Sequence, residues 1–191
     1  MLKSYRISAV NIEVVKGDNS MSNHDTEYAT FAGGCFWCMV PPFEKLEGVL
    51  SIKSGYIGGH RKNPTYEQVS TGVTGHFEAI EIGYDPSKVS YDKLIDNFWR
   101  SIDPTDQGGQ FYDRGQQYQT AVFYHNEEQK RLAEKSKEFL DKSGKFKAPI
   151  AVKILKAEEF YTAEEYHQDY HKKNYEHYKK YSVGSGRMVK G

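Results

Sequence analysis

The spacing of apolar and polar residues along this chain predicts both strands and helices, with five strands among them. The clearest strand is 77–84, in which Glu78, Ile80, Ile82 and Tyr84 alternate with other residues and therefore share one face. An acidic residue among apolar ones on that face is unusual and singles out Glu78. Four further strands are predicted over 28–32, 49–57, 119–124 and 150–155.

Two helices are predicted from their start signals. Ser90 caps one helix, whose apolar residues form a single stripe of Leu94, Ile95, Phe98, Trp99 and Ile102. Asn126 caps a second helix, which we expect over 126–143 with Gly144 as its stop.

Two other helices are expected with less regular patterns. The first should follow the strand 28–32, over about 35–47, but it contains Pro41 and Pro42. Each proline removes a backbone donor and restricts the residue before it, so we predict one turn followed by a kink or a restart. A helix rich in Tyr and His is expected over 163–174, and loops over 60–75 and 103–117.

The order of these elements bounds the fold. Strands and helices mix without a regular β-α-β rhythm, which favours the α+β class, and 191 residues fit a single domain. Residues 1–27 include a polar, turn-rich stretch and a second methionine, Met21, which could be an alternative start. We expect 1–27 to be a mobile, dispensable extension, and 28–191 to be the functional domain.

The charges balance, with 26 Lys and Arg residues against 26 Asp and Glu residues. Zero net charge argues against nucleic acid or an anionic membrane as the main partner. No apolar run approaches the ~20 residues that span a bilayer. Asn11 and Glu13 interrupt the apolar N-terminal stretch, so we predict no signal peptide. No long heptad pattern indicates a stable oligomer, and we expect a monomer.

Both cysteines of the chain lie in the stretch Gly33-Gly34-Cys35-Phe36-Trp37-Cys38. Glycines allow a sharp turn, aromatics offer an apolar wall, and the N–H groups of a helix starting at Cys35 would favour a thiolate. Thiols three residues apart on a helical turn can also close a disulfide. Two cysteines are too few for a secreted disulfide scaffold, so we expect a cytoplasmic protein with thiol chemistry.

Three interpretations of the cysteine pair stay open on the residues alone. The pair could be redox-active or nucleophilic, or it could be two inert buried thiols. It could also be half of a zinc site completed by His167 and His171, which are four residues apart on the expected helix. The zinc interpretation lacks a second Cys-x-x-Cys, and helical His pairs on polar faces are usually solvated.

Four further polar residues stand in or beside loops: Tyr66, Glu78, Asp113 and Tyr118. Burial would raise the pKa of Glu78 and let it hold a proton at neutral pH, although a surface position at a strand end would fit the pattern as well. Most of the fifteen tyrosines need only pack, and Asp113 beside Arg114 could form an ordinary ion pair. Spacing alone does not single out these four.

A run of motifs, taken together and in order, closely resembles the peptide methionine sulfoxide reductase A family. The first is Phe31-Ala32-Gly33-Gly34-Cys35-Phe36-Trp37-Cys38. The others are Ser54-Gly55-Tyr56, Asn63-Pro64-Thr65-Tyr66-Glu67-Gln68-Val69, Thr74-Gly75-His76-Phe77-Glu78-Ala79, Tyr84-Asp85-Pro86, Phe98-Trp99, Asp103-Pro104-Thr105, Asp113-Arg114-Gly115-Gln116-Gln117-Tyr118 and Glu164-Glu165-Tyr166-His167-Gln168. The resemblance covers roughly 28–175.

This resemblance implies a fold and a set of roles. The fold would be a two-layer ferredoxin-like sandwich, with a mixed sheet, flanking helices and a long irregular C-terminal segment. Cys35 would attack the sulfur of methionine sulfoxide, and Glu78 would protonate the leaving oxygen. Tyr66 and Tyr118 would hydrogen-bond that oxygen, Asp113 would order the polar groups of the site, and Phe36 with Trp37 would hold the S-methyl group.

The resemblance also implies a catalytic cycle. The S epimer, free or in proteins, would be reduced to methionine, leaving a sulfenic acid on Cys35. Cys38 would convert it to a disulfide, which thioredoxin would reduce without a further cofactor or metal. Many relatives carry resolving cysteines near the C-terminus, and this chain has none there, which matches the Cys-Phe-Trp-Cys branch. Such a protein would repair oxidised proteins during oxidative stress.

Three other functions remain as alternatives at this point. A zinc-binding structural module would use Cys35, Cys38, His167 and His171. A general dithiol oxidoreductase would reduce protein disulfides but no sulfoxide. A reader of oxidised methionine would bind it without turnover.

Overall fold

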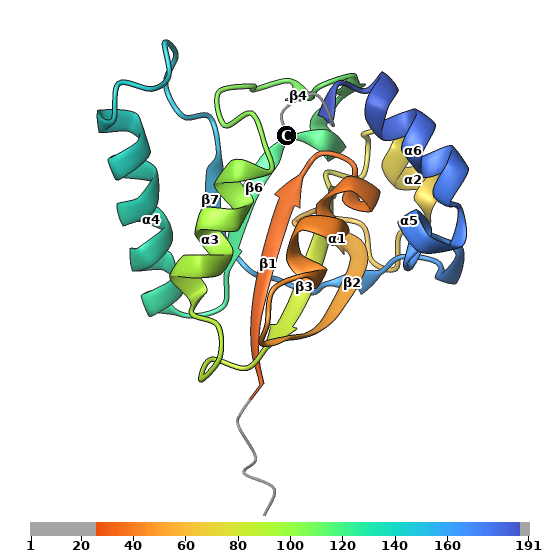
Figure 1. The fold of residues 1–191 in the computed structure, drawn as a ribbon. Coiled ribbons are helices and arrows are strands. Elements are labelled where there is room, and N and C mark those ends of the chain that lie inside the picture. The colour runs from red at the N-terminus through yellow and green to blue at the C-terminus, as the bar shows by residue number, and fades with distance from the viewer. Residues whose placement is uncertain (1–25, 188–191) are drawn as a thin grey trace, which may run out of the picture.

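The structure is a computed structural model that describes residues 26–187. The predicted N-terminal extension, apart from its last two residues, lies outside the described residues. Figure 1 shows helices α1 and α3 lying on the near face of a sheet, with helices α5 and α6 gathered beside one edge. The elements that form this layered arrangement are α1 (Phe36–Glu44), α3 (Tyr91–Arg100), α4 (Glu127–Lys142), α5 (Tyr170–Lys173) and α6 (Tyr175–Gly184).

The sheet has six strands in the order β7-β6-β1-β3-β2-β8. Its four central strands pair antiparallel and are joined through α1 and α3, which is the ferredoxin-like arrangement expected from the resemblance. The outer strand β7 runs parallel to β6, which makes the sheet mixed. The strands are β1 (Glu27–Gly33), β2 (Val49–Ile57), β3 (Phe77–Tyr84), β6 (Thr120–Tyr124), β7 (Lys153–Lys156) and β8 (Tyr161–Thr162).

Apolar side chains cover both faces of this sheet. On the helical face, the Phe31 ring stacks on Phe43, Tyr91 and Phe98, with ring centroids 5.0 to 6.2 Å apart. A second cluster lies on the opposite face, formed by Ala32, Ile57, Phe77, Ala79, Ala121 and Phe123 and packed against Leu155, Ala157 and Phe160. Burial on both faces explains why almost every residue of β3 is buried, whereas alternation predicts one buried face.

Helix α1 contains both prolines as a single element, so the predicted kink or restart is not what the structure has. Each proline removes one backbone donor, but Met39 and Phe43 are fully buried against the sheet and anchor the helix on either side. The Pro42 carbonyl also accepts a hydrogen bond from Asn97 Nδ2 at 3.1 Å. Tertiary packing therefore outweighs the poor helix propensity of this segment.

Four other segments differ from the prediction. The predicted loop 60–75 contains helix α2 (Tyr66–Ser70), which is started by a capping box between Thr65 and Gln68. The predicted helix 163–174 is broken into a 3₁₀ turn, Glu165–His167, and α5, because Asp169 adopts the left-handed conformation (φ 52°). The C-terminal segment, expected to be irregular, contains helix α6. Strand β7 starts three residues later than expected.

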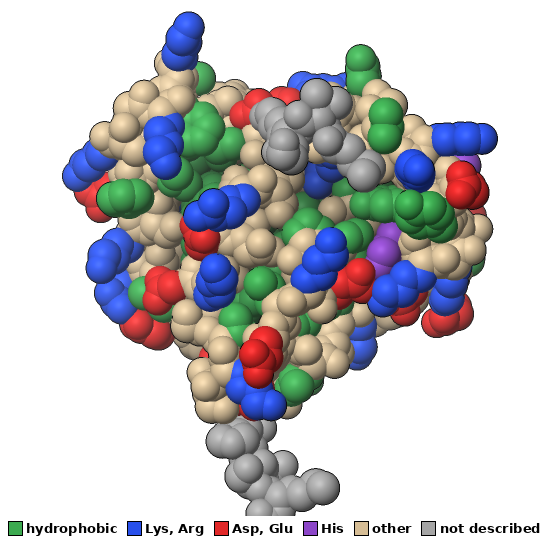
Figure 2. Space-filling model, in the orientation of Figure 1, with side chains coloured by type: hydrophobic (Ala, Val, Ile, Leu, Met, Phe, Trp, Pro, Cys, Tyr) green, Lys and Arg blue, Asp and Glu red, His purple; other side chains and the backbone are tan. Residues whose placement is uncertain are grey.

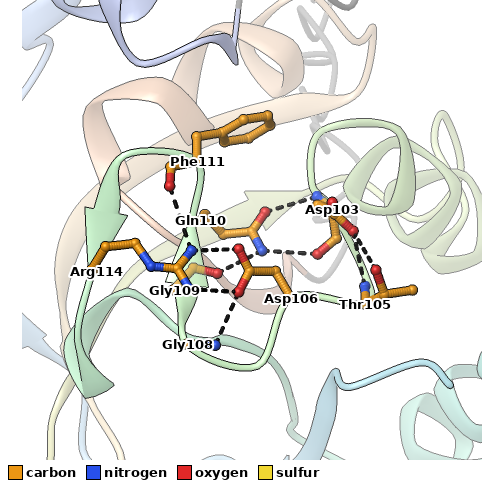
Figure 3. Close-up of polar contacts among 8 residues, drawn as sticks. All are labelled: Asp103, Thr105, Asp106, Gly108, Gly109, Gln110, Phe111 and Arg114. Carbon is orange, nitrogen blue, oxygen red and sulfur yellow. Dashed lines mark hydrogen bonds and ion pairs between the residues drawn. The ribbon is translucent and has the colours of Figure 1, made fainter. Parts of the chain in front are cut away.

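The long loop after α3 is held by its own polar side chains (Figure 3). Buried Gln110 bridges the backbone of Asp103, accepting from its N–H and donating to its carbonyl, each at 2.8 Å. Arg114 forms an ion pair with Asp106 at 2.5 Å. These contacts fix the short hairpin of β4 (Gly109–Gln110) and β5 (Asp113–Arg114), which carries Asp113.

Basic and acidic side chains are interspersed over the helical face, with no continuous surface of one sign (Figure 2). This distribution agrees with the zero net charge of the chain. Among residues 26–187, no helix is long and apolar enough to cross a membrane.

Candidate active site

Cys35 and Cys38 lie at the start of helix α1, directly after strand β1. Cys35 is the N-cap of α1, and the Cys38 N–H donates to the Cys35 carbonyl at 3.1 Å. Both thiols are free, and each residue is 5% exposed. Gly34 has φ +82°, and a Cβ there would lie 2.6 Å from Gln110 Cβ, so this turn requires glycine.

Glu78 reaches this turn from the neighbouring strand β3. Its side chain is on the helical face, the residue is 2% exposed, and Oε2 accepts a hydrogen bond from the Phe36 N–H at 3.1 Å. The first N–H of α1 therefore points to the carboxyl of Glu78, whereas the sequence led us to expect it at the Cys35 sulfur. No side-chain cap bond joins Cys35 to the helix.

The surroundings of Glu78 favour its neutral form. Burial is the largest cause and raises the pKa of Glu78 well above its ordinary value. The negative charges that Cys35 and Asp113 can carry raise this pKa further, while the Phe36 N–H opposes them. The site thus favours the protonated form of Glu78, which is the form that a proton donor requires.

Two phenols border the same acid. Tyr66 opens helix α2 and Tyr118 ends a 3₁₀ turn, Gln116–Tyr118, so they come from different loops. Burial, followed by the charge of Glu78, raises the pKa of Tyr66 to about 12 and raises the pKa of Tyr118 as well. Both hydroxyls stay protonated and can donate hydrogen bonds near the Glu78 carboxyl.

Asp113 has an unexpected partner. Its Oδ1 accepts from the Tyr181 hydroxyl at 2.5 Å, while its sequence neighbour Arg114 pairs with Asp106. Tyr181 also lies beside Cys35, where its hydroxyl acts to lower the pKa of that thiol, although burial outweighs this effect. No pattern in the sequence pointed to Tyr181, because α6 was not predicted and Tyr181 is one of fifteen tyrosines.

Phe36 and Trp37 form an aromatic cluster beside the thiol. Trp37 stacks on Tyr170 with centroids 3.8 Å apart, and its Nε1–H donates to His167 Nδ1 at 3.1 Å. The Phe36 ring lies 5.0 Å from the His167 ring, centroid to centroid. Burial lowers the pKa of His167, so the ring stays neutral and keeps the acceptor that Trp37 needs.

Glu164 forms hydrogen bonds with Tyr66 and with Tyr56, whose ring lies beside Phe36. Its carboxylate accepts from the Tyr66 backbone N–H and from the Tyr56 hydroxyl, each at 2.8 Å. These contacts assign a positioning task to Glu164 and His167. In the sequence, Glu164 carried no role and His167 was considered only as a zinc ligand.

The zinc interpretation finds no support in these contacts. His167 is bonded to Trp37, and His171 is bonded to Glu44 at 2.9 Å. Over residues 26–187, no three His, Cys, Asp or Glu side chains are grouped so that they could hold a metal ion.

The pKa values of the two thiols are shifted in opposite directions. Burial, followed by the neighbouring Cys38 and Asp113, raises the pKa of Cys35 well above its ordinary value. A hydrogen bond from the Cys35 thiol lowers the pKa of Cys38, and the positive charge of Arg187 adds to this effect. The Cys35 thiol therefore stays protonated at neutral pH.

Comparison with known proteins shows which protein family this sequence matches. The sequence profile described as "Peptide methionine sulfoxide reductase" matches residues 27–190. The protein named "Peptide methionine sulfoxide reductase MsrA" from Bacillus licheniformis is 60% identical over 161 residues, which cover 84% of this chain and 89% of that protein.

Solved structures resemble the fold as well. Mxr1 from Saccharomyces cerevisiae in reduced form superimposes with a TM-score of 0.71 and 32% identity, covering 78% of this chain and 86% of Mxr1. Mxr1 in complex with Trx2 gives a TM-score of 0.51 and 25% identity, covering 76% and 84%.

The neutral form of Glu78 can be tested through protein stability. We predict that the unfolding free energy of the wild type, minus that of Glu78→Gln, falls by about 1.4 kcal/mol per pH unit above pH ~4.3. Below that pH both folded and unfolded wild type carry the proton, so the difference is constant. As pH rises, the unfolded chain loses its proton first, and the loss of stability ends once the raised pKa of folded Glu78 is passed.

Urea unfolding of both proteins across this pH range measures the difference directly, and other titrating groups cancel in the subtraction. A difference that does not change with pH would show that Glu78 ionises in the folded protein as it does in the unfolded chain.

Proposed function

The chain belongs to the peptide methionine sulfoxide reductase family, and we propose that it reduces the S epimer of methionine sulfoxide by means of Cys35 and Glu78. The observation that carries the proposal is the buried, protonated Glu78 bonded to the first N–H of α1, one residue after the Cys35 thiol. A sulfoxide has a strongly polar S–O bond, and breaking it needs a proton at oxygen while a sulfur nucleophile adds at sulfur.

The proposed substrate position follows from the groups around Cys35. The sulfoxide oxygen would accept hydrogen bonds from Glu78, Tyr66 and Tyr118, all of which are donors in the resting site. Such preorganised donors stabilise the charge that develops on oxygen in the transition state. The methyl group would lie against Phe36 and Trp37, whose rings His167 and Tyr170 hold in place.

These contacts support a choice between epimers. Sulfur in a sulfoxide is pyramidal, so fixing its oxygen at Glu78, its methyl at Phe36 and Trp37, and its open face toward Cys35 leaves one handedness able to react. The family resemblance assigns this to the S epimer. The remaining chain of the substrate then points outward, so free and protein-bound methionine sulfoxide both fit.

The first half of the reaction converts one thiol and one sulfoxide into a sulfenic acid and a thioether. The Cys35 sulfur adds to the substrate sulfur, its proton leaves, and Glu78 protonates the oxygen. Transfer of the oxygen to Cys35 releases methionine and leaves Cys35 as a sulfenic acid. Asp113 and Tyr181 form a hydrogen-bonded pair beside Cys35 that can relay its proton.

In the second half, Cys38 is proposed to attack the sulfenic sulfur, releasing water and forming a Cys35–Cys38 disulfide. In the reduced protein the neighbouring Cys35 lowers the pKa of Cys38, and a lower pKa increases the fraction of thiolate that can make this attack. Thioredoxin is the proposed reductant, supported by the related Mxr1 in complex with Trx2. The two thiols supply both electrons, so the proposed cycle requires no other cofactor. A monomeric state stays a prediction.

The boundaries of the functional unit, a dispensable 1–27 and a catalytic 28–191, are part of this proposal. The matched region 27–190 supports them. The cytoplasmic location stays a prediction.

The substrate assignment is tested with peptides that carry separated S and R methionine sulfoxide. We expect reduction of the S peptide alone by the purified protein with thioredoxin, thioredoxin reductase and NADPH, followed by chromatography of the methionine product. Reduction of the R peptide at a similar rate would contradict the proposed placement of the methyl group. No reduction of either peptide by protein with intact Cys35 would overturn the proposed function.

The resolving role is tested with two matched serine variants. Cys38→Ser should release one methionine per chain and then stop, with a sulfenic acid on Cys35 that dimedone labels and mass spectrometry detects. Cys35→Ser should release none, because the nucleophile is missing. Repeated thioredoxin-dependent turnover by Cys38→Ser would show that another group resolves the intermediate.

A further inference from the structure

Three exposed apolar side chains lie on three segments that also carry, or contact, groups of the proposed site. Val73 is 73% exposed, Tyr112 is 76% exposed and Tyr166 is 52% exposed. Single exposed apolar residues are ordinary on a protein surface. These three come from segments that are distant in the chain and meet at one site, and the mechanism above does not use them. We refer to Val73, Tyr112 and Tyr166 as the apolar rim.

Tyr166 lies on the side of the site that holds Tyr66. The ring of Tyr166 is 4.2 Å from the His167 ring, and the His167 ring is 4.5 Å from the Tyr66 ring, centroid to centroid. Tyr166 therefore continues the aromatic cluster of the site outward, from a buried histidine to the solvent.

Val73 follows helix α2 and lies beside the turn that carries Tyr118. Two glutamine side chains of that turn donate to the carbonyls of Ser70 and Gly75, each at 2.9 Å. These two hydrogen bonds are made on either side of Val73 in the chain. They hold the loop of Val73 against the 3₁₀ turn, next to the second phenol of the site.

Tyr112 directly precedes Asp113 in the short hairpin of β4 and β5. Arg114 donates to the Phe111 carbonyl at 3.4 Å, which joins the residues on either side of Tyr112 and Asp113 (Figure 3). Asp113 itself accepts from the Tyr181 hydroxyl at 2.5 Å. The exposed ring of Tyr112 is thus carried by a hairpin that is fixed both to itself and to the site.

We infer that the apolar rim binds the side chains two positions before and two positions after methionine sulfoxide in an extended segment of an oxidised protein. The class of protein substrate is therefore one with apolar or aromatic residues at those two positions. The inference rests on the proposed function, which supplies the position of the sulfoxide, and it adds the sequence around that sulfoxide.

The geometry of an extended chain selects these positions. Successive side chains of a strand point to opposite sides, so a residue and its second neighbours point the same way. When the sulfoxide side chain enters the site, the second neighbours face the protein about 7 Å away on each side. The adjacent residues point away into the solvent. The rim can therefore contact the second neighbours and not the adjacent residues.

Contact with the rim favours protein-bound substrate over the free amino acid. Apolar side chains that meet Val73, Tyr112 and Tyr166 remove apolar surface from water. The rim segments are already held by hydrogen bonds and ring contacts, so binding orders little of the protein. Tyrosine also has few rotatable bonds and gives a large contact area at a small cost in entropy. Free methionine sulfoxide has no neighbouring residues and gains none of this.

Two isomeric peptides test the inference on the wild-type protein. Both are heptapeptides of the same composition with a central S methionine sulfoxide. One carries Phe at the second neighbours and Ser at the adjacent positions, and the other has these exchanged. With dithiothreitol as reductant, we expect kcat/KM to be about fivefold or more higher for Phe at the second neighbours. Equal values, or a preference for the other isomer, would overturn the inference.

A double variant, Val73→Ser with Tyr112→Ser, tests which residues read the peptide. The ratio of kcat/KM between the two isomers should fall toward one, and a ratio that stays at the wild-type value would overturn the assignment of the rim. Phe139→Ser is the matched control, because Phe139 is also 73% exposed but lies on helix α4, away from these loops (Figure 1). It should keep the wild-type ratio.

Free S methionine sulfoxide separates this inference from the proposed function. If the wild-type protein reduces neither peptide nor the free amino acid with dithiothreitol, the proposed function itself has failed. If it reduces the free amino acid and both peptides at equal kcat/KM, the proposed function stands and the apolar rim has failed.

Discussion

The hydrogen bond from the Phe36 N–H to Glu78 joins the start of helix α1 to strand β3, and the rest of the site is arranged around it. It places a buried acid one residue from the Cys35 thiol. A single N–H does not offset the burial of the carboxyl, so Glu78 retains its proton. The site can therefore hold an acid and a thiol side by side without two negative charges in the same buried space.

The chain encloses this centre with segments that are distant in sequence. Glu164 and His167 lie after the last helix–strand unit, yet they position Tyr66 and Trp37 through hydrogen bonds. Helix α6 then brings Tyr181 to Asp113 and Cys35. Strand β3 thus supplies the acid and the start of α1 supplies the thiols, and the C-terminal segment completes the donors and the aromatic pocket.

The local sequence pattern predicted the strands of the sheet well. It predicted the C-terminal segments that surround the site poorly. Strands 49–57 and 77–84 agree with the structure because their composition and flanking turns are local signals. The break at Asp169 depends on a left-handed residue, and the position of Tyr181 depends on contacts with a hairpin far away in sequence. Glu78 stood out only as an acid on an apolar face, and its partner, the Phe36 N–H, could not be read from spacing.

The central claim is that Glu78 is a neutral acid in the resting site. Infrared difference spectroscopy between the wild type and Glu78→Gln, both reduced and at neutral pH, tests it most directly. The account predicts a carboxylic-acid carbonyl band in the wild type that shifts in D₂O and is missing from the variant. A difference spectrum containing only carboxylate bands would show that Glu78 is ionised, and would contradict its role as the proton donor.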